Sequence, residues 1–504
     1  MFTWKTSWKF SKPLTVGGME IEMKLSTKFL GVTLDHKLSW NEHIDKQCRK
    51  AKGIRIQCRR AVGPTWGFTP KTMKWIYTAI VRPALSYGAV ILINGARTKH
   101  NIAKLSAVQR LGNILITGAL PSTSSTALNK ITGSIPIEHW IEEEACQGAL
   151  RLKANGFWDQ EPIISKRGNL TSHIKINNKI INEIPFAREE SDVMTTTLSI
   201  DTKFEVQIAD RNLYEEPMHD ENTIHCYTDG SKIESDVGAG VYITKNSENW
   251  LEESVYLGTK STVFQAETYA VGRAAKFLIN RGTTQQDIII HCDCQPTIMA
   301  VDNTKIKSKT TLETIVALNT LGEQNNVLLE WIPAHSGYEG NEKVDSLAKK
   351  GANNQDSSLE SLPIPKVRWN EGLRKRTLAK TENDWGASPP SHIKRVWRDK
   401  FSKEIPKLNR KNLRIATQLL SGHAVVNYHL NKYKPNSIPK TCPHCLAEEE
   451  TLNHHIGQCP KWSAQRGALF ESFYMSLTDI VDSNSLSNIL HFLNSTRRLS
   501  ERYS

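Results

Sequence analysis

Between residues 222 and 352 the hydrophobic positions change repeatedly from alternating to helical spacing. TIHCYTDG, GAGVYIT and WLEESVYLG read as three strands joined by short turns, which makes them antiparallel neighbours. TVFQAETYAVGRAAKFLI has helical spacing, with Thr262 as its N-cap and Gly282 just past its end. DIIIHCDC is a β-branched strand that returns parallel to the first by way of that helix. This alternation is typical of an α/β fold in which helices cover a mixed sheet.

Two further elements complete this region. LLEWIPAHSG predicts a fifth strand that runs into a loop, and EGNEKVDSLAKKGA predicts a closing helix that ends at Gly351. We therefore expect a five-stranded mixed sheet with flanking helices.

The rest of the chain is mainly helical by pattern. KTMKWIYTAIVRPALSYGAVIL carries Met73, Ile76 and Ile80 at helical spacing, with Pro83 near a break. A chain of 504 residues is long for one core, so we expect several domains. The predicted division is a helical region 1–155, a linker 156–221, the α/β domain 222–352, a linker 353–365, a basic helical region 366–440, a Cys/His module 441–462 and a helical tail 463–504.

The composition is that of an ordinary globular protein, with 39% hydrophobic and 23% charged residues. No run of about 18 apolar residues is present, and the first residues lack an apolar signal core. Nine cysteines, an odd number, do not suit a secreted disulfide framework. We expect an intracellular protein, in the nucleus or the cytoplasm, without a membrane partner.

The net charge of +13 is unevenly distributed. No acidic residue lies between Asp45 and Glu138, where there are fifteen Lys or Arg, and residues 366–440 carry 18 basic against 5 acidic side chains. Residues 220–352 are acidic instead, with 18 Asp or Glu against 12 Lys or Arg. Basic regions on both sides of an acidic centre favour polyanion binding beside a cation-requiring site, although charge for solubility alone gives the same map.

Four carboxylates in the α/β region occupy related positions. Asp229 is predicted to end the first strand, Glu267 lies in the first turns of the helix, Asp293 ends the fourth strand, and Asp345 lies on the closing helix. Each alone is easily explained as a cap or a solvated side chain. Brought together they would repel one another unless divalent cations neutralised them. Oxygen ligands of this kind suit Mg²⁺ or Mn²⁺.

The motifs YTDGS, FQAE, CDCQ and WIPAHSGYEGNEKVDSLAK resemble the type 1 ribonuclease H family over 222–352. The resemblance implies that the four carboxylates hold two metal ions for hydrolysis of the RNA strand of an RNA–DNA hybrid. It further implies a proton-shuttling role for His335, a substrate-binding role for Asn341 and a minor-groove contact for Gln295. This chain has Ala334, Cys294 and Val344 where glycine, serine and alanine are common.

Recognition of an RNA strand needs contacts to 2′-hydroxyl groups across a shallow groove. We expect these contacts from Gly230 and Ser231, with Gln265 and Gln295 nearby. His291 shares a strand face with Asp293 and is interpreted as a packing residue.

The N-terminal third has a resemblance of its own. FLGVTLDHKLSWNEHI, WIYTAIVRPALSYGAV and LSAVQRLGNILITGA are similar to the end of a non-LTR retrotransposon reverse transcriptase of the insect Jockey and R1 type, after the palm. The paired aspartates of a YADD-type polymerase motif are absent from the sequence. We expect no polymerase activity from this chain, and an upstream reverse transcriptase polypeptide as a partner.

Near the C-terminus, cysteine and histidine residues have metal-ligand spacing. Two residues separate Cys442 from Cys445, eight separate Cys445 from His454, and four separate His454 from Cys459. Three thiolates and one imidazole suit a tetrahedral structural Zn²⁺ site. His444 or His455 are alternatives to His454. The module also resembles one that follows ribonuclease H in insect elements of this type.

The sequence thus predicts a metal-dependent ribonuclease H in a retrotransposon-derived protein. The alternative from another class is a catalytically silent nucleic-acid-binding remnant, which would keep the basic regions without turnover. A stand-alone ribonuclease H is disfavoured by the flanking regions.

Overall fold

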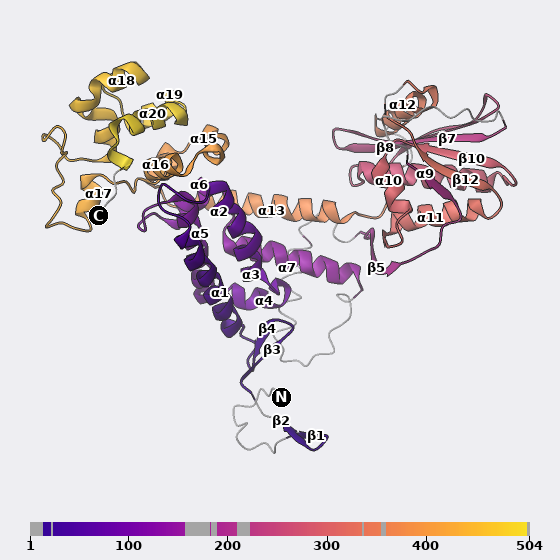
Figure 1. Cartoon of the computed structure of the whole chain (residues 1–504), viewed down its shortest axis with the longest axis horizontal. Coiled ribbons are helices and arrows are strands. Elements are labelled where there is room, and N and C mark those ends of the chain that lie inside the picture. The colour runs from indigo at the N-terminus through magenta and orange to yellow at the C-terminus, as the bar shows by residue number, and fades with distance from the viewer. Residues whose placement is uncertain are drawn as a thin grey trace. The chain divides into compact units, whose positions relative to one another are not determined.

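The computed structural model describes residues 14–21, 24–156, 182, 189–208, 222–334, 337–353 and 359–500 (Figure 1). These residues fall into two compact units. One contains the described residues up to Cys146 and from Arg374 onward, and the other contains those from Gln147 to Leu373. We call them the helical unit and the α/β unit.

The α/β unit is built on a six-stranded sheet with the order β6-β12-β10-β7-β8-β9. The pairs β7–β8 and β8–β9 are antiparallel, and β10 runs parallel to β7, as the sequence predicts. β10 also runs parallel to β12, a pairing that the sequence analysis left open. Its elements are β5 (Val193–Leu198), β6 (Glu205–Gln207), β7 (Ile224–Ile233), β8 (Asp236–Lys245), β9 (Glu248–Tyr256), α9 (Val263–Asn280), β10 (Asp287–Cys292), α10 (Gln295–Val301), β11 (Ile306–Ser308), α11 (Lys309–Gly322), β12 (Asn326–Trp331) and α12 (Glu339–Asn353).

The sixth strand comes from the stretch predicted as a linker. Within 156–221, the described residues form β5, which pairs with β11, and β6, which pairs in parallel with β12. Two backbone bridges tie the second predicted linker to the α/β unit, and Ile364 is buried there. The paired segments within both stretches are short, so they leave little periodic signal in the sequence.

Helices cover both faces of the sheet, as Figure 1 shows. On one face, small and apolar side chains of α9 and α11 form a core with alternating strand residues such as Ile224, Cys226 and Ile290. On the other face, α12 approaches so closely that a Cβ atom at Gly240 would lie 2.5 Å from the Val344 carbonyl oxygen. These contacts fix the positions of α9 and α12 on opposite faces of the sheet.

The helical unit combines residues from both ends of the sequence. Its core contains apolar side chains of the N-terminal helices, such as Leu105 and Leu128, together with Leu413, Leu420 and Phe492 from the C-terminal region. Its elements are β1 (Leu14–Val16), β2 (Met19–Ile21), β3 (Ser26–Phe29), β4 (Val32–Asp35), α1 (Asn41–Arg60), α2 (Pro70–Ile76), η2 (Tyr77–Val81), α3 (Arg82–Ser86), α4 (Ala89–Ala96), α5 (Lys99–Thr117), α6 (Ser125–Thr132), α7 (Ile137–Ala154), α13 (Lys366–Ala387), α14 (His392–Val396), α15 (Lys400–Glu404), η3 (Ile405–Lys407), α16 (Arg410–Ser421), α17 (Asn427–Asn431), η4 (His454–Gln458), η5 (Pro460–Trp462), α18 (Ser463–Phe470), α19 (Leu477–Ser483), α20 (Leu486–Thr496) and η6 (Arg498–Ser500), of which α7 and α13 extend into the α/β unit.

The predicted helix around Pro83 is continuous to Ser86 and breaks at Gly88, which has a φ of 76°. The π-helical turn η2 lies just before Pro83, because proline cannot donate the backbone hydrogen bond that regular α-helix requires. No single helix in the described part of the chain is long and apolar enough to cross a membrane. The helices Pro70–Ser86 and Ala89–Ala96 reach that length and composition only as a pair, and they are bent by 79°.

Candidate active site and metal centre

Asp229 lies inside a strand rather than at its end, so that prediction is wrong. β7 continues to Ile233, because Gly230 and Ser231 pair with Ala239 and Gly238 of β8. Pairing of β7 with β10, in contrast, stops at Thr228. Asp229 is therefore the first residue of β7 beyond the end of β10, and its side chain is buried.

Glu267 reaches Asp229 because α9 begins very close to β7. Thr262 caps the helix by accepting a hydrogen bond from the Gln265 backbone N–H, as predicted, and Gln265 completes the capping box. A Cβ atom at Gly230 would lie 2.6 Å from the Glu267 backbone nitrogen, so only glycine permits this approach. Glu267 is 4% exposed.

The third carboxylate follows β10 directly. Asp293 comes one residue after Cys292, the last residue of the strand, and its carbonyl oxygen accepts a hydrogen bond from Trp331 Nε1 at 3.0 Å. One carboxylate oxygen from each of Asp229, Glu267 and Asp293 lies within 4.8 Å of the others. We call these three side chains the carboxylate trio.

The electrostatics of the trio favour a neutralising cation. Burial, and then the charges of Asp293 and Asp345, raise the pKa of Asp229 to about 6. Burial and the charge of Asp229 raise the pKa of Glu267 well above its ordinary value. Glu267 Oε2 is buried and has no hydrogen-bond partner among the described residues. A buried acceptor without a donor is costly, and a hard divalent cation would satisfy it. The trio thus fits Mg²⁺ or Mn²⁺.

Asp345 lies near the trio but is engaged elsewhere. It is on α12, as predicted, and its charge contributes to the raised pKa of Asp229. Its carboxylate accepts a hydrogen bond from Lys349 Nζ, one helical turn later, at 2.6 Å. A spacing of four residues on a helix is typical of such a pair. Lys349 therefore partly neutralises the fourth carboxylate.

The predicted substrate-binding residues have different surroundings. Gln265 is 1% exposed, with Oε1 accepting from the Thr262 backbone and Nε2 donating to the Pro363 carbonyl oxygen at 2.9 Å. Its side chain is committed to these partners. Gln295 is the first residue of α10, and Asn341 is buried in α12. His335 lies outside the described residues.

A row of aromatic and charged side chains lies on the strands beside the trio. His291 is 4% exposed, its Nδ1 lies 3.1 Å from Glu330 Oε2, and its ring stacks on Tyr227 with centroids 4.6 Å apart. His225 Nδ1 lies 3.1 Å from His291 Nε2. These contacts join β7, β10 and β12, consistent with a packing role for His291.

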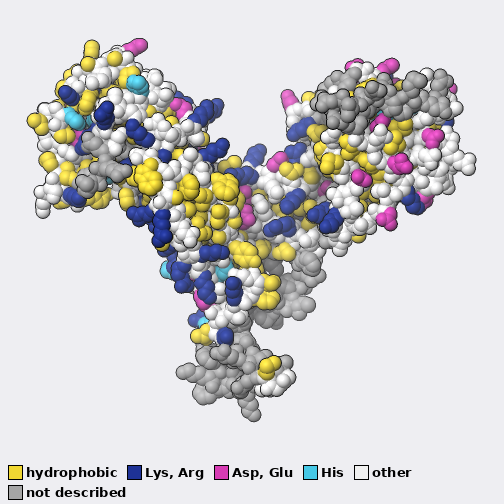
Figure 2. Space-filling model, in the orientation of Figure 1, with side chains coloured by type: hydrophobic (Ala, Val, Ile, Leu, Met, Phe, Trp, Pro, Cys, Tyr) yellow, Lys and Arg dark blue, Asp and Glu magenta, His cyan; other side chains and the backbone are white. Residues whose placement is uncertain are grey.

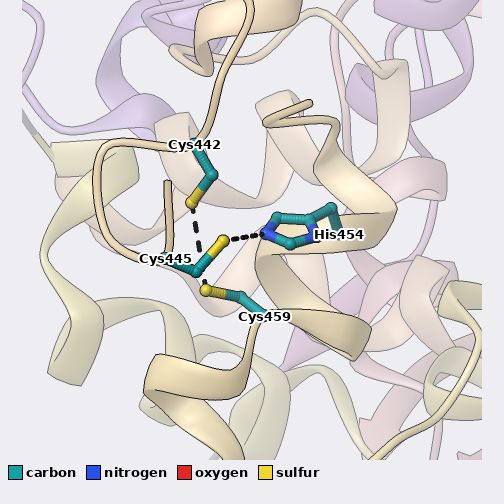
Figure 3. A group of neighbouring side chains, drawn as sticks. All are labelled: Cys442, Cys445, His454 and Cys459. Carbon is teal, nitrogen blue, oxygen red and sulfur yellow. Dashed lines mark hydrogen bonds between the residues drawn. The ribbon is translucent and has the colours of Figure 1, made fainter. Parts of the chain in front are cut away.

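The cysteine and histidine residues near the C-terminus converge as Figure 3 shows. Ligand atoms of Cys442, Cys445, His454 and Cys459 lie within 4.8 Å of one another. The sulfur atoms of Cys442 and Cys459 are 3.9 Å apart, and Cys445 Sγ is 3.4 Å from His454 Nε2. We call these four residues the Cys/His cluster.

The ligand choice within this cluster follows from hydrogen bonds around it. His454 Nδ1 lies 2.8 Å from Glu448 Oε2, which directs Nε2 toward the sulfur atoms. A carboxylate in this position commonly orients a metal-binding histidine. The alternatives have other neighbours: His455 Nε2 contacts Thr496 Oγ1 at 3.2 Å, and the His444 ring packs against Trp462 at 5.2 Å. Neither belongs to the cluster.

The thiols differ in acidity. Burial works against ionisation of Cys445, but hydrogen bonds from the backbone N–H groups of Ala447 and Glu448 outweigh it and lower the pKa of this thiol to about 7. Burial raises the pKa of Cys459 to about 12. A cation bound by the cluster would favour the thiolate form of both. Three sulfur atoms and one imidazole nitrogen fit Zn²⁺.

Comparison with known proteins places the α/β unit. Residues 221–353 match the model of the RNase H family, so this part of the chain is an RNase H domain. The ribonuclease H of Tropheryma whipplei is 41% identical over 59 residues, which are 12% of this chain and 35% of that protein.

Two Drosophila melanogaster proteins are also similar. The 115 kDa protein of the type-1 retrotransposable element R1DM is 23% identical over 121 residues, 24% of this chain and 12% of that protein. A probable RNA-directed DNA polymerase of transposon BS is 24% identical over 152 residues, 30% of this chain and 17% of that protein. The chain therefore matches a small part of each curated relative.

Solved structures with similar folds include RNase H1 of the archaeon Halobacterium salinarum, 18% identical with a TM-score of 0.22, which covers 26% of this chain and 99% of its own. LC11-RNase H1 in complex with an RNA/DNA hybrid is 24% identical with a TM-score of 0.23, and covers 27% of this chain and 100% of its own.

Proposed function

We propose that the RNase H domain hydrolyses the RNA strand of an RNA–DNA hybrid, internally and with two Mg²⁺ or Mn²⁺ ions. The observation that carries this proposal is the carboxylate trio, assembled in a domain that matches the RNase H family. Buried, unneutralised carboxylates reduce stability, so their presence is best explained by a cation that they bind.

Asp229, Glu267 and Asp293 would hold the ions, with Asp345 as a fourth ligand. Such ions, when bound, activate water and stabilise the leaving oxygen in phosphodiester hydrolysis. The chain's own contribution is to hold the acceptors in place. Gly230 admits α9 close to β7, and the end of β10 brings Asp293 beside Asp229. Ser231, Gln295 and Asn341 are the proposed substrate contacts, and His335 the proposed proton shuttle.

The experiment is cleavage of a labelled hybrid by the full chain, with Mg²⁺ and with EDTA. Asp293→Asn removes one carboxylate charge and should abolish cleavage, because the metal ions are lost. Hybrid binding should stay within about twofold of wild type, because the cationic side chains that contact phosphates are unchanged. Asp302→Asn, at an exposed position after α10, is the matched control and should cleave like wild type.

Cleavage of duplex DNA at the same rate as the hybrid would contradict the proposal. Equal hybrid cleavage by Asp293→Asn and wild type would contradict it too. Binding without any cleavage by the wild-type chain would support the catalytically silent remnant instead.

We propose further that the Cys/His cluster binds one structural Zn²⁺ ion. Elemental analysis of the purified full chain should find about one zinc per chain, and Cys442→Ser/Cys445→Ser should lose it together with stability. Glu448→Gln should weaken zinc binding by about 10- to 100-fold, because it removes the partner of His454 Nδ1. Cys58→Ser, outside the cluster, is the control. A folded wild-type chain without zinc would refute this proposal.

The curated relatives suggest the origin of the chain. Its similarity to the two Drosophila transposon proteins supports descent from a non-LTR retrotransposon, with an upstream reverse transcriptase polypeptide as a partner. Co-purification with the reverse transcriptase of the same element would test that partnership.

A further inference from the structure

Two stretches without acidic residues, far apart in the sequence, meet in the helical unit. The first is 46–137, and the second is 405–447, which contains seven Lys or Arg and no Asp or Glu. They meet where α16 packs on α5 and α6. Arg410 donates from Nε to the Phe68 carbonyl oxygen at 2.8 Å and from Nη1 to the Leu115 carbonyl oxygen at 2.9 Å. The two acid-free stretches are therefore neighbours in the folded helical unit.

A serine and two histidines mark the centre of this junction. Ser122 Oγ lies 3.0 Å from His423 Nδ1 and 3.3 Å from His429 Nε2. A hydroxyl has a single hydrogen to donate, so at least one ring donates its N–H to the serine oxygen. Arg110 holds the same loop by donating to the carbonyl oxygens of Pro121 and Thr123.

The charged groups that act on these rings are cationic. Burial lowers the pKa of His423, and Lys432 and Arg110 lower it further. Burial, His423 and Lys432 lower the pKa of His429 to about 4. Both imidazoles are therefore neutral hydrogen-bonding groups at pH 7, with cations beside them.

Three carboxylates follow the second acid-free stretch, and each has a partner. Glu448 lies 2.8 Å from His454 Nδ1 in the Cys/His cluster. Glu449 lies 3.6 Å from Lys440, and Glu450 lies 2.7 Å from Arg498. Among the described residues, neither Lys432 nor Arg110 forms an ion pair with a carboxylate, so their positive charge remains available at the junction.

Exposed aromatic rings lie on the segments that meet here. Tyr433 is 62% exposed, and its ring packs edge-on against His429 at 5.4 Å. Trp66 is 52% exposed, in a loop whose Pro64 carbonyl oxygen faces Gly118, where a Cβ atom would lie 3.0 Å away. The same Cβ atom would lie 3.4 Å from Arg414 Cβ. The tryptophan loop, the end of α5 and α16 are therefore in contact.

We propose that this junction surface, formed by Trp66, Arg110, Ser122, His423, His429, Lys432 and Tyr433, binds single-stranded nucleic acid. Exposed rings among Lys and Arg are the combination that grips single strands, because bases stack on the rings while phosphates contact the cations. In a duplex the base faces are already stacked on one another, so a duplex would contact only the Lys and Arg side chains through its phosphates. The surface belongs to the helical unit, so its binding does not depend on cleavage by the RNase H domain.

The experiment measures binding of the full chain to fluorescent (dT)20 and (U)20, and to a hybrid of equal length without divalent metal. Trp66→Ala/Tyr433→Ala should weaken single-strand binding by about 30-fold or more, because one stacked base is lost at each of the two rings. Hybrid binding should change by less than about twofold. Because both rings are exposed, the variant should keep the thermal stability of wild type.

Two further variants separate stacking from charge and from the general loss of an exposed ring. Lys432→Gln should reduce the slope of log affinity against log salt by about 0.7 on a single strand. Phe473→Ala removes a ring that is 63% exposed, outside the junction, and should bind like wild type. Unchanged single-strand affinity of Trp66→Ala/Tyr433→Ala would overturn the proposal. An equal loss for single strand and hybrid would overturn it too, because it would show a surface that contacts phosphates alone.

Discussion

At the scale of single residues, the carboxylate trio links metal binding to stability. In the metal-free protein the pKa of Asp229 is about 6, against an ordinary value of 3.8. A carboxyl group whose pKa is raised by folding binds its proton more tightly in the folded state than in the unfolded state. The folded state is therefore favoured at low pH. This contribution is lost as the pH rises from about 4 to above 6, where the folded protein must bury a charged Asp229.

We therefore expect Asp229→Asn to stabilise the metal-free protein at pH 8 and to have little effect at pH 4. The difference in pKa corresponds to about 3 kcal/mol in the free energy of unfolding as an upper bound. Denaturant unfolding of both proteins in EDTA, across this pH range, measures it. Asp302→Asn should show no such pH dependence. A variant less stable than wild type at pH 8 would show that Asp229 stabilises the fold without metal.

At the scale of elements, the site depends on how closely α9 approaches β7. The capping box of Thr262 and Gln265 begins the helix, and the missing side chain of Gly230 lets its first turns rest on the strand. Ala266 and its neighbour Glu267, in the second turn of the helix, then lie against the strand beside Asp229. Steric fit between two backbones thus determines the separation of two carboxylates.

Gly230→Ala should therefore disturb both folding and the site. Its Cβ atom would lie 2.6 Å from the Glu267 nitrogen and 2.9 Å from Ala266 Cβ, so the helix must shift. We expect a loss of about 1–3 kcal/mol in the free energy of unfolding, and weaker Mg²⁺ binding by calorimetry. Gly53→Ala, in α1 with open space around it, should be neutral or slightly stabilising. Wild-type stability and metal affinity in Gly230→Ala would contradict this account.

At the scale of the whole molecule, positive charge is concentrated in the helical unit and negative charge in the RNase H domain. Lys and Arg side chains gather over α1 and α5 in Figure 2. Arg59 and Arg60 are exposed at the end of α1. Arg374 and Arg376 are less available, because they pair with Glu143 and Glu142 on α7 at 3.6 and 3.7 Å. Phosphate binding should therefore depend on exposed cations such as Arg59 and Arg60 rather than on ion-paired ones.

Charge reversal at Arg59 and Arg60 should weaken binding of duplex, hybrid and single strand alike. For each phosphate that these side chains neutralise, the slope of log affinity against log salt should fall by about 0.9 on duplex DNA. Titrations of the full chain at several salt concentrations measure this slope. The same charge change at Lys305 and Lys307, exposed in the RNase H domain, should leave it nearly unchanged. Equal effects of both double variants would mean that net charge, not this surface, controls affinity.

Local features of this protein follow from the sequence alone. Strand alternation and the N-cap at Thr262 depend mainly on neighbours within a few residues, so pattern and propensity were sufficient to predict them. The parallel return of β10 was predicted from the helix before it, because parallel strands need a crossover connection of this kind. The spacing of Cys442, Cys445, His454 and Cys459 also predicted the group that converges. The carboxylates of the trio were predicted from their places on the expected strands and helix.

Which distant segments meet depends on tertiary packing. Asp229 proved to lie within β7, because pairing with β8 continues beyond pairing with β10. β6 joined the sheet by using an edge that its own three residues do not specify. The core shared by α5, α6 and α16 formed because an apolar helix face specifies that it must be buried, but not against which partner. Because a helix face does not specify its packing partner, the sequence could not predict that the two acid-free stretches meet.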